Sequence, residues 1–121
     1  MAEVLPFETE RFGLINANLS MHYFNWKITE QIFSEIKRIL KPKGILIGRV
    51  NSDKIEGYDI EHAKQLEEHY YYNENYGKYY RLFESTQWEV LTKGWKVKHL
   101  KEKEIIRKNN KKVLWEFILQ K

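Results

Sequence analysis

The chain has 121 residues, a length typical of a single domain, and we expect residues 1–121 to form one domain. With 42% hydrophobic and 15% aromatic residues it is too apolar for a disordered chain, and no apolar run approaches the roughly 20 residues that span a bilayer. The absence of cysteine excludes disulfides, thiolate chemistry and cysteine-ligated metals. Because the N-terminus has no signal-peptide pattern, a soluble, cytoplasmic protein is expected.

The net charge of +4 is concentrated in the last third of the chain, between residues 96 and 112. Glu102 and Glu104 lie among the lysines and arginines of this segment, as on a mixed, solvent-exposed face. Binding of nucleic acid through a basic hairpin is the alternative, and it predicts an affinity that falls steeply with salt. We favour the exposed face, because basic clustering alone is weak evidence for nucleic-acid contact.

The first half of the chain has the pattern of a strand, a helix and a second strand. Residues 12–19 are mostly apolar on both faces, as in a parallel sheet that is covered by helices. Asn25 can cap the following helix, in which isoleucines recur at helical spacing, and Pro42 and Gly44 are expected to end it. Residues 45–50 form a second buried strand, so a right-handed βαβ unit is predicted.

Two further helices are expected after this unit. The first covers residues 60–72. Ser85 can cap the second, which carries Trp88 and Leu91, and Gly94 offers the positive φ angle that commonly ends a helix.

The chain ends in a predicted antiparallel hairpin, with strands at 95–107 and 112–121. Asn109 and Asn110 tolerate the left-handed conformation that a tight turn requires. The second strand is apolar on both faces apart from Glu116, whereas the first is mostly charged. We therefore expect the last strand to be internal in its sheet and its predecessor to be an edge.

Several local patterns occur together in one order: Leu5-Pro-Phe-Glu before Phe12-Gly-Leu-Ile, the exit Asn18-Leu-Ser-Met-His-Tyr-Phe24, the helix end Ile39-Leu-Lys-Pro-Lys-Gly44, and the terminal hairpin. In this order the chain resembles the carboxyl-terminal half of a class I S-adenosylmethionine-dependent methyltransferase. It departs from the family at Gly13, where aspartate is usual, and at Lys43, where a second glycine is frequent. The resemblance implies an α/β fold: a truncated Rossmann-like methyltransferase sheet with a βαβ unit, then helices and a C-terminal antiparallel β-hairpin.

The resemblance also implies S-adenosylmethionine as the cofactor and places Asn18, Leu19 and Ser20 beside it. Alternatively, Asn18 only satisfies the backbone at the strand exit. His22 is a candidate general base next to the site of methyl transfer, with a packed or capping histidine as the alternative. The sequence contains no Gly-x-Gly, the turn with which the family holds the cofactor, so we expect weak or no binding by the monomer.

A tyrosine-rich segment follows, where the family often has a lid that binds the methyl acceptor. Tyr70, Tyr76 and Tyr80 are candidate substrate-binding residues, because tyrosine combines apolar surface with a polar hydroxyl. The alternative is that these rings only cover the sheet. No metal site is expected from the spacing of the histidines His62, His69 and His99.

Two functions stay open at this point, and with them whether the isolated chain is an enzyme. The first is the carboxyl-terminal portion of a methyltransferase that acts on an unidentified small acceptor and is inactive as a monomer. The second is a non-catalytic interaction module or relic that dimerises through an exposed sheet edge. In both, strand 12–19 needs cover, from a homodimer or from a separately encoded N-terminal half.

Overall fold

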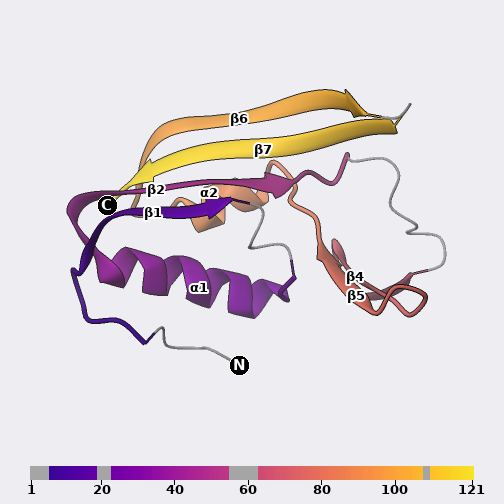
Figure 1. The fold of residues 1–121 in the computed structure, drawn as a ribbon, viewed down its shortest axis with the longest axis horizontal. Helices are drawn as coiled ribbons and strands as arrows, with labels where there is room; N and C mark the ends of the chain where they lie inside the picture. Colours follow the sequence, from indigo (N-terminus) through magenta and orange to yellow (C-terminus); the bar gives the residue numbers. More distant parts are fainter. Residues whose placement is uncertain (1–5, 19–22, 55–62, 108–109) are drawn as a thin grey trace.

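A computed structural model describes residues 6–18, 23–54, 63–107 and 110–121. Within these residues the chain forms a four-stranded sheet in the order β1-β2-β7-β6 and a three-stranded sheet in the order β3-β4-β5. The large sheet consists of β1 (Phe12–Asn18), β2 (Leu40–Asn51), β6 (Lys96–Arg107) and β7 (Asn110–Gln120). The small sheet consists of β3 (Lys64–Glu67), β4 (Tyr70–Asn73) and β5 (Lys78–Arg81), and it lies toward the arrowheads of β1 and β2 (Figure 1).

The predicted strand, helix and strand of the first half are confirmed. The helix α1 (Trp26–Ile39) connects β1 to β2, which pair in parallel. Asn25 caps it, because its side-chain oxygen accepts a hydrogen bond from the N–H of Ile28 at 2.9 Å. The helix ends before the expected stop, since Leu40 is already extended and belongs to β2. The positive φ angle in this turn falls on Lys43 and not on Gly44.

The terminal hairpin is confirmed as well. Strand β7 pairs antiparallel with β6 on one side and with β2 on the other, so the last strand is internal and β6 is an edge, as predicted. Of the expected turn residues, Asn109 lies outside the described residues and Asn110 begins β7. The opposite edge of the sheet is β1, which pairs only with β2 among the described strands.

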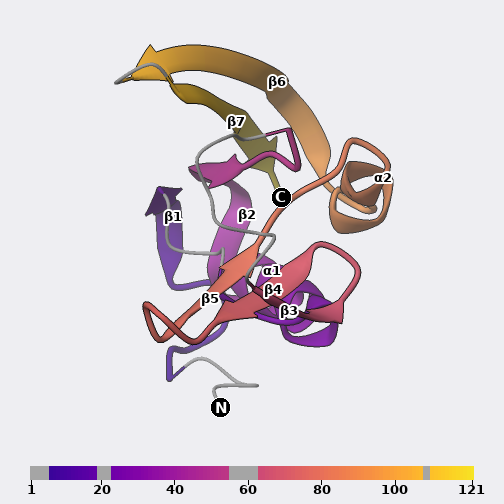
Figure 2. The ribbon, with the colours of Figure 1, turned by 90° about the vertical axis from the view of Figure 1, so that its right-hand side faces the viewer.

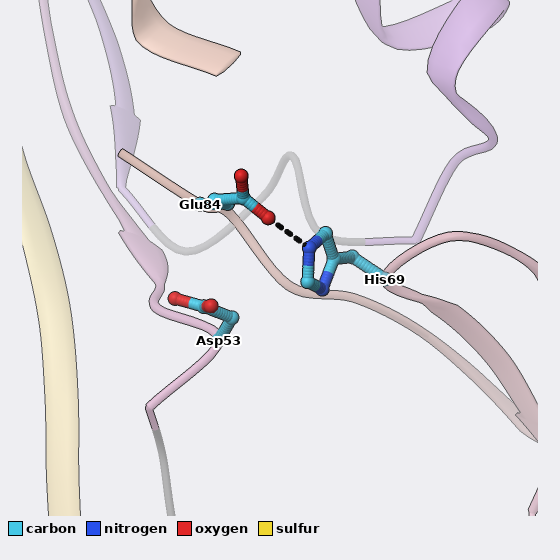
Figure 3. Close-up of side chains that lie close together, drawn as sticks. All are labelled: Asp53, His69 and Glu84. Carbon is cyan, nitrogen blue, oxygen red and sulfur yellow. Dashed lines mark hydrogen bonds and ion pairs between the residues drawn. The ribbon is translucent and has the colours of Figure 1, made fainter. Parts of the chain in front are cut away.

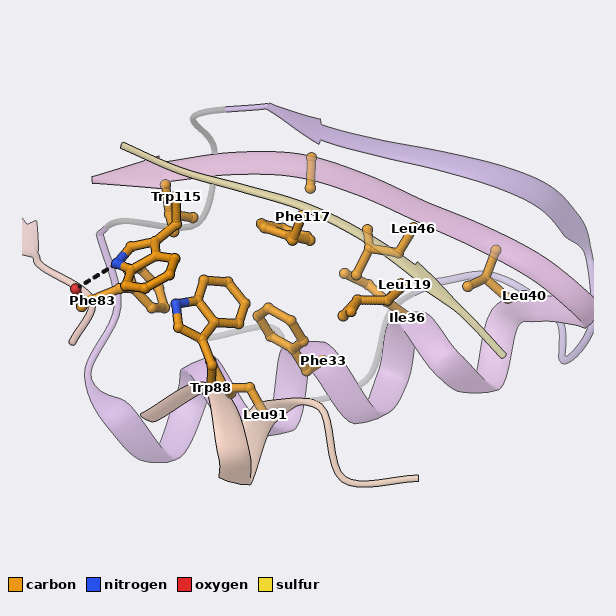
Figure 4. Packing of buried hydrophobic residues seen from close by; sticks show 12 residues of the cluster. Phe33, Ile36, Leu40, Leu46, Phe83, Trp88, Leu91, Trp115, Phe117 and Leu119 are labelled. Atoms are coloured by element: carbon orange, nitrogen blue, oxygen red, sulfur yellow. Dashed lines mark hydrogen bonds between the residues drawn. The ribbon is translucent and has the colours of Figure 1, made fainter. Parts of the chain in front are cut away.

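Helices α1 and α2 (Gln87–Leu91) cover one face of the large sheet, and the core lies between them and the sheet (Figures 2 and 4). The indole of Trp88 is at its centre, 5.1 Å from the ring of Phe117 and 6.3 Å from that of Phe33. Along β2, Leu46 and Val50 are fully buried, whereas Ile47, which points to the other face, is 37% exposed. The sheet is thus covered on one face and open on the other.

Two expectations for the second half were wrong. Residues 64–67 and 70–73 are strands, not part of a helix, while residues 60–62 lie outside the described residues. Consecutive tyrosines favour strands, and Gly77, with a φ angle of 61°, supports the tight turn between β4 and β5. The helix α2 is confirmed, but its N-cap is Thr86 and not Ser85.

Gly94 has the expected positive φ angle, 82°, after α2. In the described part of the chain, no helix has both the length and the apolar character needed to cross a membrane.

Candidate functional site

The carboxyl ends of β1 and β2 lie side by side, because the two strands are parallel and Asn18 is paired with Arg49. Ligands of parallel α/β sheets bind beyond such strand ends. Just past the end of β2, Ser52 forms an isolated parallel bridge with Phe83, which follows the small sheet in the sequence. The N–H of Asp53 donates to the carbonyl of Phe83 at 3.0 Å. The segment after β5 therefore returns to the end of β2.

Asp53, His69 and Glu84 meet at this junction (Figure 3). Asp53 follows β2, His69 lies in the turn between β3 and β4, and Glu84 precedes α2. All three side chains are half-buried, and their potential ligand atoms lie within 4.8 Å of one another. Nε2 of His69 is hydrogen-bonded to Oε2 of Glu84. Main-chain bonds support the cluster, since the N–H of Leu82 donates to the carbonyl of His69 at 2.9 Å.

The charges of the cluster are unbalanced. Hydrogen bonds from the hydroxyl of Thr86 and from the ring of His69 lower the pKa of Glu84, so this carboxylate is ionised at neutral pH. A further carboxylate oxygen, from the exposed side chain of Glu68, lies 3.5 Å from Nε2 of His69. A neutral imidazole among carboxylates can ligate a metal ion together with them.

A second set of polar side chains connects the same junction to the edge strand β6 by hydrogen bonds. The hydroxyl of Ser52 donates to Glu102 at 2.6 Å, and the ammonium of Lys54 lies 3.0 Å from the other carboxylate oxygen. Burial alone raises the pKa of Glu102, but these two hydrogen bonds outweigh it and lower the pKa below its ordinary value. Both sides of the end of β2 are therefore held by hydrogen bonds.

Arg81 fixes the small sheet to the start of α1. Its side chain is completely buried, and its guanidinium donates to the carbonyl of Phe24 at 3.0 Å. It pairs with the carboxylate of Glu67, which also accepts a hydrogen bond from the N–H of Trp26 at 2.8 Å. The guanidinium lies over the ring of Tyr70, 4.9 Å from its centroid. The small sheet is therefore held at the cluster and at the helix.

Residues 1–48 match a family model described as a methyltransferase domain. No curated protein sequence matches the chain significantly. The fold is similar to that of a S-adenosylmethionine-dependent methyltransferase from Methanosarcina mazei, with a TM-score of 0.78 and 17% identity over 100% of this chain and 64% of that one. The chain has a methyltransferase fold. The predicted fold class and the resemblance to this family are thereby confirmed.

Two further solved structures are similar to this chain in fold. The 1,6-didemethyltoxoflavin-N1-methyltransferase of Burkholderia thailandensis, solved with 1,6-didemethyltoxoflavin and S-adenosylhomocysteine, has a TM-score of 0.68 and 15% identity over 99% of this chain and 48% of that one. A protein from Pyrococcus horikoshii has the same TM-score, 0.68, and 19% identity over 99% of this chain and 56% of that one. The chain thus spans between 48% and 64% of the length of these three structures.

Of the candidate cofactor residues, Asn18 lies among the residues that the structure describes, at the end of β1. The backbone of Asn18 completes the strand. The three other residues predicted for cofactor contact or catalysis lie outside the described residues: Leu19, Ser20 and His22. Their roles stay predictions.

The candidate substrate residues are placed apart from one another. Tyr70 is 9% exposed, and its hydroxyl donates to the carbonyl of Tyr23 at 3.0 Å. Burial, as the largest cause, raises its pKa. Tyr80 is paired with Tyr71 and therefore lies on the other face of the small sheet, whereas Tyr76 lies in the turn after β4 and is 65% exposed. Tyr70 is thus buried and Tyr76 exposed, and the substrate-binding roles of the three tyrosines stay predictions.

Sequence reasoning missed Asp53 and Glu84 and set His69 aside. Histidine spacing carries no signal here, because each of the three residues comes from a different segment and only tertiary contacts join them. A usable signal was the position of Asp53 just after a buried strand of a βαβ unit, where site residues of parallel sheets are common.

Proposed function

We propose that this chain is the carboxyl-terminal, acceptor-side portion of a S-adenosylmethionine-dependent methyltransferase. The observation that carries the proposal is the match of the entire chain to the methyltransferase from Methanosarcina mazei, with a TM-score of 0.78. The Burkholderia thailandensis enzyme, which is similar in fold, was solved with S-adenosylhomocysteine. Methyl transfer depends mainly on positioning an already activated methyl group, so it does not require a dense set of catalytic side chains.

The cofactor site is shared with another polypeptide segment in this proposal. The chain contains no Gly-x-Gly, and its contribution to cofactor binding comes from Asn18, at the end of β1, and from Leu19 and Ser20, which follow it in the sequence. The methionine and ribose groups of the cofactor then lack most of their polar partners. The isolated monomer is accordingly inactive.

The open side of the sheet supports a missing partner. On β1, Leu14 is 62% exposed, and a groove of about 420 Å³ runs between β1 and α1, lined by apolar side chains that include Phe12, Ile15 and Ile36. A second hollow of about 320 Å³ lies on the uncovered face, beside Ile47. Parallel strands such as β1 and β2 are normally covered on both faces, and an apolar edge strand such as β1 can pair with a strand of another chain.

The decisive experiment combines the chain with the segment that completes the cofactor site. Calorimetric titration of S-adenosylmethionine into residues 1–121 is expected to give no binding in the micromolar range. The DNA just upstream is expected to encode a strand followed by Gly-x-Gly, and co-expression of that segment should restore micromolar binding. Micromolar binding by residues 1–121 alone would contradict the shared site, and no binding by the combined segments would contradict the methyltransferase proposal.

The exposed edge of β1 also favours a second function, a non-catalytic module that pairs with another copy of itself. Leu14 lies on this edge without a proline or lysine in β1 to discourage pairing. This alternative predicts a stable homodimer that binds no S-adenosylmethionine under any of the conditions above.

A further inference from the structure

The cluster at the end of β2 has the donor atoms of a metal centre. Asp53 and Glu84 each offer a carboxylate oxygen, and His69 offers an imidazole nitrogen, all within 4.8 Å of one another. Three protein ligands that leave other coordination positions open are the usual arrangement of a catalytic zinc ion. The mixture of imidazole and carboxylate suits a first-row transition metal better than Mg²⁺ or Ca²⁺, which prefer oxygen ligands only.

The charge around His69 is a separate reason. Carboxylate oxygens of both Glu84 and Glu68 lie within ion-pair distance of its Nε2, and Asp53 is close by. Even a protonated imidazole neutralises only one of these three carboxylates. Among the residues that the structure describes, the ammonium of Lys54 interacts electrostatically with Asp53, but its ion pair is with Glu102, 3.0 Å away. A divalent cation would balance the excess negative charge.

The backbone holds the three ligand segments in place without the ion. The bridge between Ser52 and Phe83 sets Asp53 beside the segment that carries Glu84. The hydrogen bond between the N–H of Leu82 and the carbonyl of His69 brings the turn after β3 to the same segment. Glu84 is further supported by the hydroxyl of Thr86, as metal-bound carboxylates commonly are by their neighbours.

We propose that Asp53, His69 and Glu84 bind a divalent transition-metal ion, for which Zn²⁺ is the best fit, and that the ion replaces the proton of the hydrogen bond between His69 and Glu84, which is released to solvent. The site lies beyond the carboxyl ends of β1 and β2, on the side where the acceptor is expected. An open coordination position there can take an oxygen or nitrogen of the methyl acceptor. This role rests on the proposed function, whereas binding of the metal does not.

Metal binding is measured on the full chain with Zn²⁺ and Co²⁺ salts after treatment with a chelator. Calorimetry should show one Zn²⁺ bound per chain, and Co²⁺ should give visible absorption bands typical of mixed nitrogen and oxygen coordination. Asp53→Asn and Glu84→Gln keep the shape of each side chain and remove its charge, and each should weaken Zn²⁺ binding at least tenfold. The matched control is Glu74→Gln, which removes an exposed carboxylate in the turn after β4 and should leave binding unchanged.

Two results would overturn the site. One is the absence of saturable binding at millimolar Zn²⁺ to a chain that is folded by circular dichroism. The other is binding that Asp53→Asn, Glu84→Gln and Glu74→Gln leave equally unchanged, which would indicate adsorption elsewhere. Because neither measurement involves S-adenosylmethionine, loss of the metal site and failure of the methyltransferase proposal are distinguishable. If Glu84→Gln unfolds the chain, a Zn²⁺-dependent rise in the melting temperature of the unmodified chain, absent in His69→Gln, decides the question.

Discussion

Gly48 of β2 lies directly opposite Phe117 of β7, and a Cβ atom at position 48 would come within 2.7 Å of the Phe117 ring. On the other side, the carbonyl oxygen of Ala17 would be 3.1 Å away. Gly48→Ala should therefore lower the free energy of unfolding by about 1 to 3 kcal/mol, measured by urea denaturation. Gly13→Ala is the control, because no atom lies within 4 Å of its Cβ position. Equal effects of the two substitutions would contradict the close packing of β2 against β7.

Arg81→Lys should destabilise the chain although the charge is retained. A lysine cannot donate simultaneously to the carbonyl of Phe24, the carbonyl of Glu68 and the carboxylate of Glu67. Leaving a buried acceptor without its donor costs roughly 2 kcal/mol, which is the expected loss in chemical denaturation. Arg11→Lys, at a residue whose side chain is 57% exposed, should change stability by less than about 0.5 kcal/mol. If Arg81→Lys left the free energy of unfolding unchanged, the small sheet would not be anchored through this guanidinium.

Glu116 should contribute to stability only above acidic pH. The ammonium of Lys103, 3.0 Å away, and the ring of His99 lower the pKa of Glu116 in the folded state. A lowered folded pKa gives stabilisation that is complete above the unfolded value of about 4.3 and is lost as the pH falls through the folded value. Glu116→Gln should thus cost about 0.5 to 1 kcal/mol at pH 7, and the difference should vanish in acid.

The control for this pH series is Glu104→Gln. The carboxylate of Glu104 is 58% exposed, and its distance of 3.9 Å from the ammonium of Lys111 makes a weak ion pair. Its removal should therefore have little effect on stability at any pH. The free energies of unfolding of Glu116→Gln and the unmodified chain could instead differ by the same amount at every pH between 7 and 3. That result would count against the pairing of Glu116 with Lys103.

Leu14→Lys should reduce self-association of the chain. A lysine on the exposed edge β1 opposes strand pairing, and because Leu14 is 62% exposed the fold itself should lose little stability. Light scattering at micromolar concentration is expected to give a dimer for the unmodified chain and a monomer for Leu14→Lys. Val90→Lys, at an apolar residue of α2 that is 51% exposed, should leave the dimer intact. A well-folded monomer of the unmodified chain would refute pairing through β1.

The elements that the sequence predicted correctly are those specified by local signals. The capping side chain of Asn25, the helical spacing of the isoleucines and the apolar pattern of the last strand each lie within a few residues of the structure that they specify. The resemblance to the methyltransferase family then supplied the order of the strands. In these elements, contacts with residues far away in the sequence did not override the local preference.

The small sheet was missed because its local signal is ambiguous. Leu66, Tyr70 and Asn73 share one face of a helix, yet consecutive tyrosines also favour a strand. The choice is made by distant partners, since the guanidinium of Arg81 lies against the rings of Tyr70 and Trp26. The grouping of Asp53, His69 and Glu84 depends on the position of the same sheet, so it could not be predicted from the sequence either.

The chain leaves the large sheet after β2 and returns to the end of that strand at Phe83, whose carbonyl accepts a hydrogen bond from the N–H of Asp53 at 3.0 Å. The stretch between Asp53 and Phe83 therefore begins and ends at neighbouring residues. The entropy of closing such a loop changes by only about 0.6 kcal/mol for each doubling of its length. This stretch can be exchanged for one of different length and composition while the strands and helices around Trp88 stay as they are. Under the proposed function, exchanging this stretch should change acceptor preference, provided that an arginine at the position of Arg81 still reaches the start of α1.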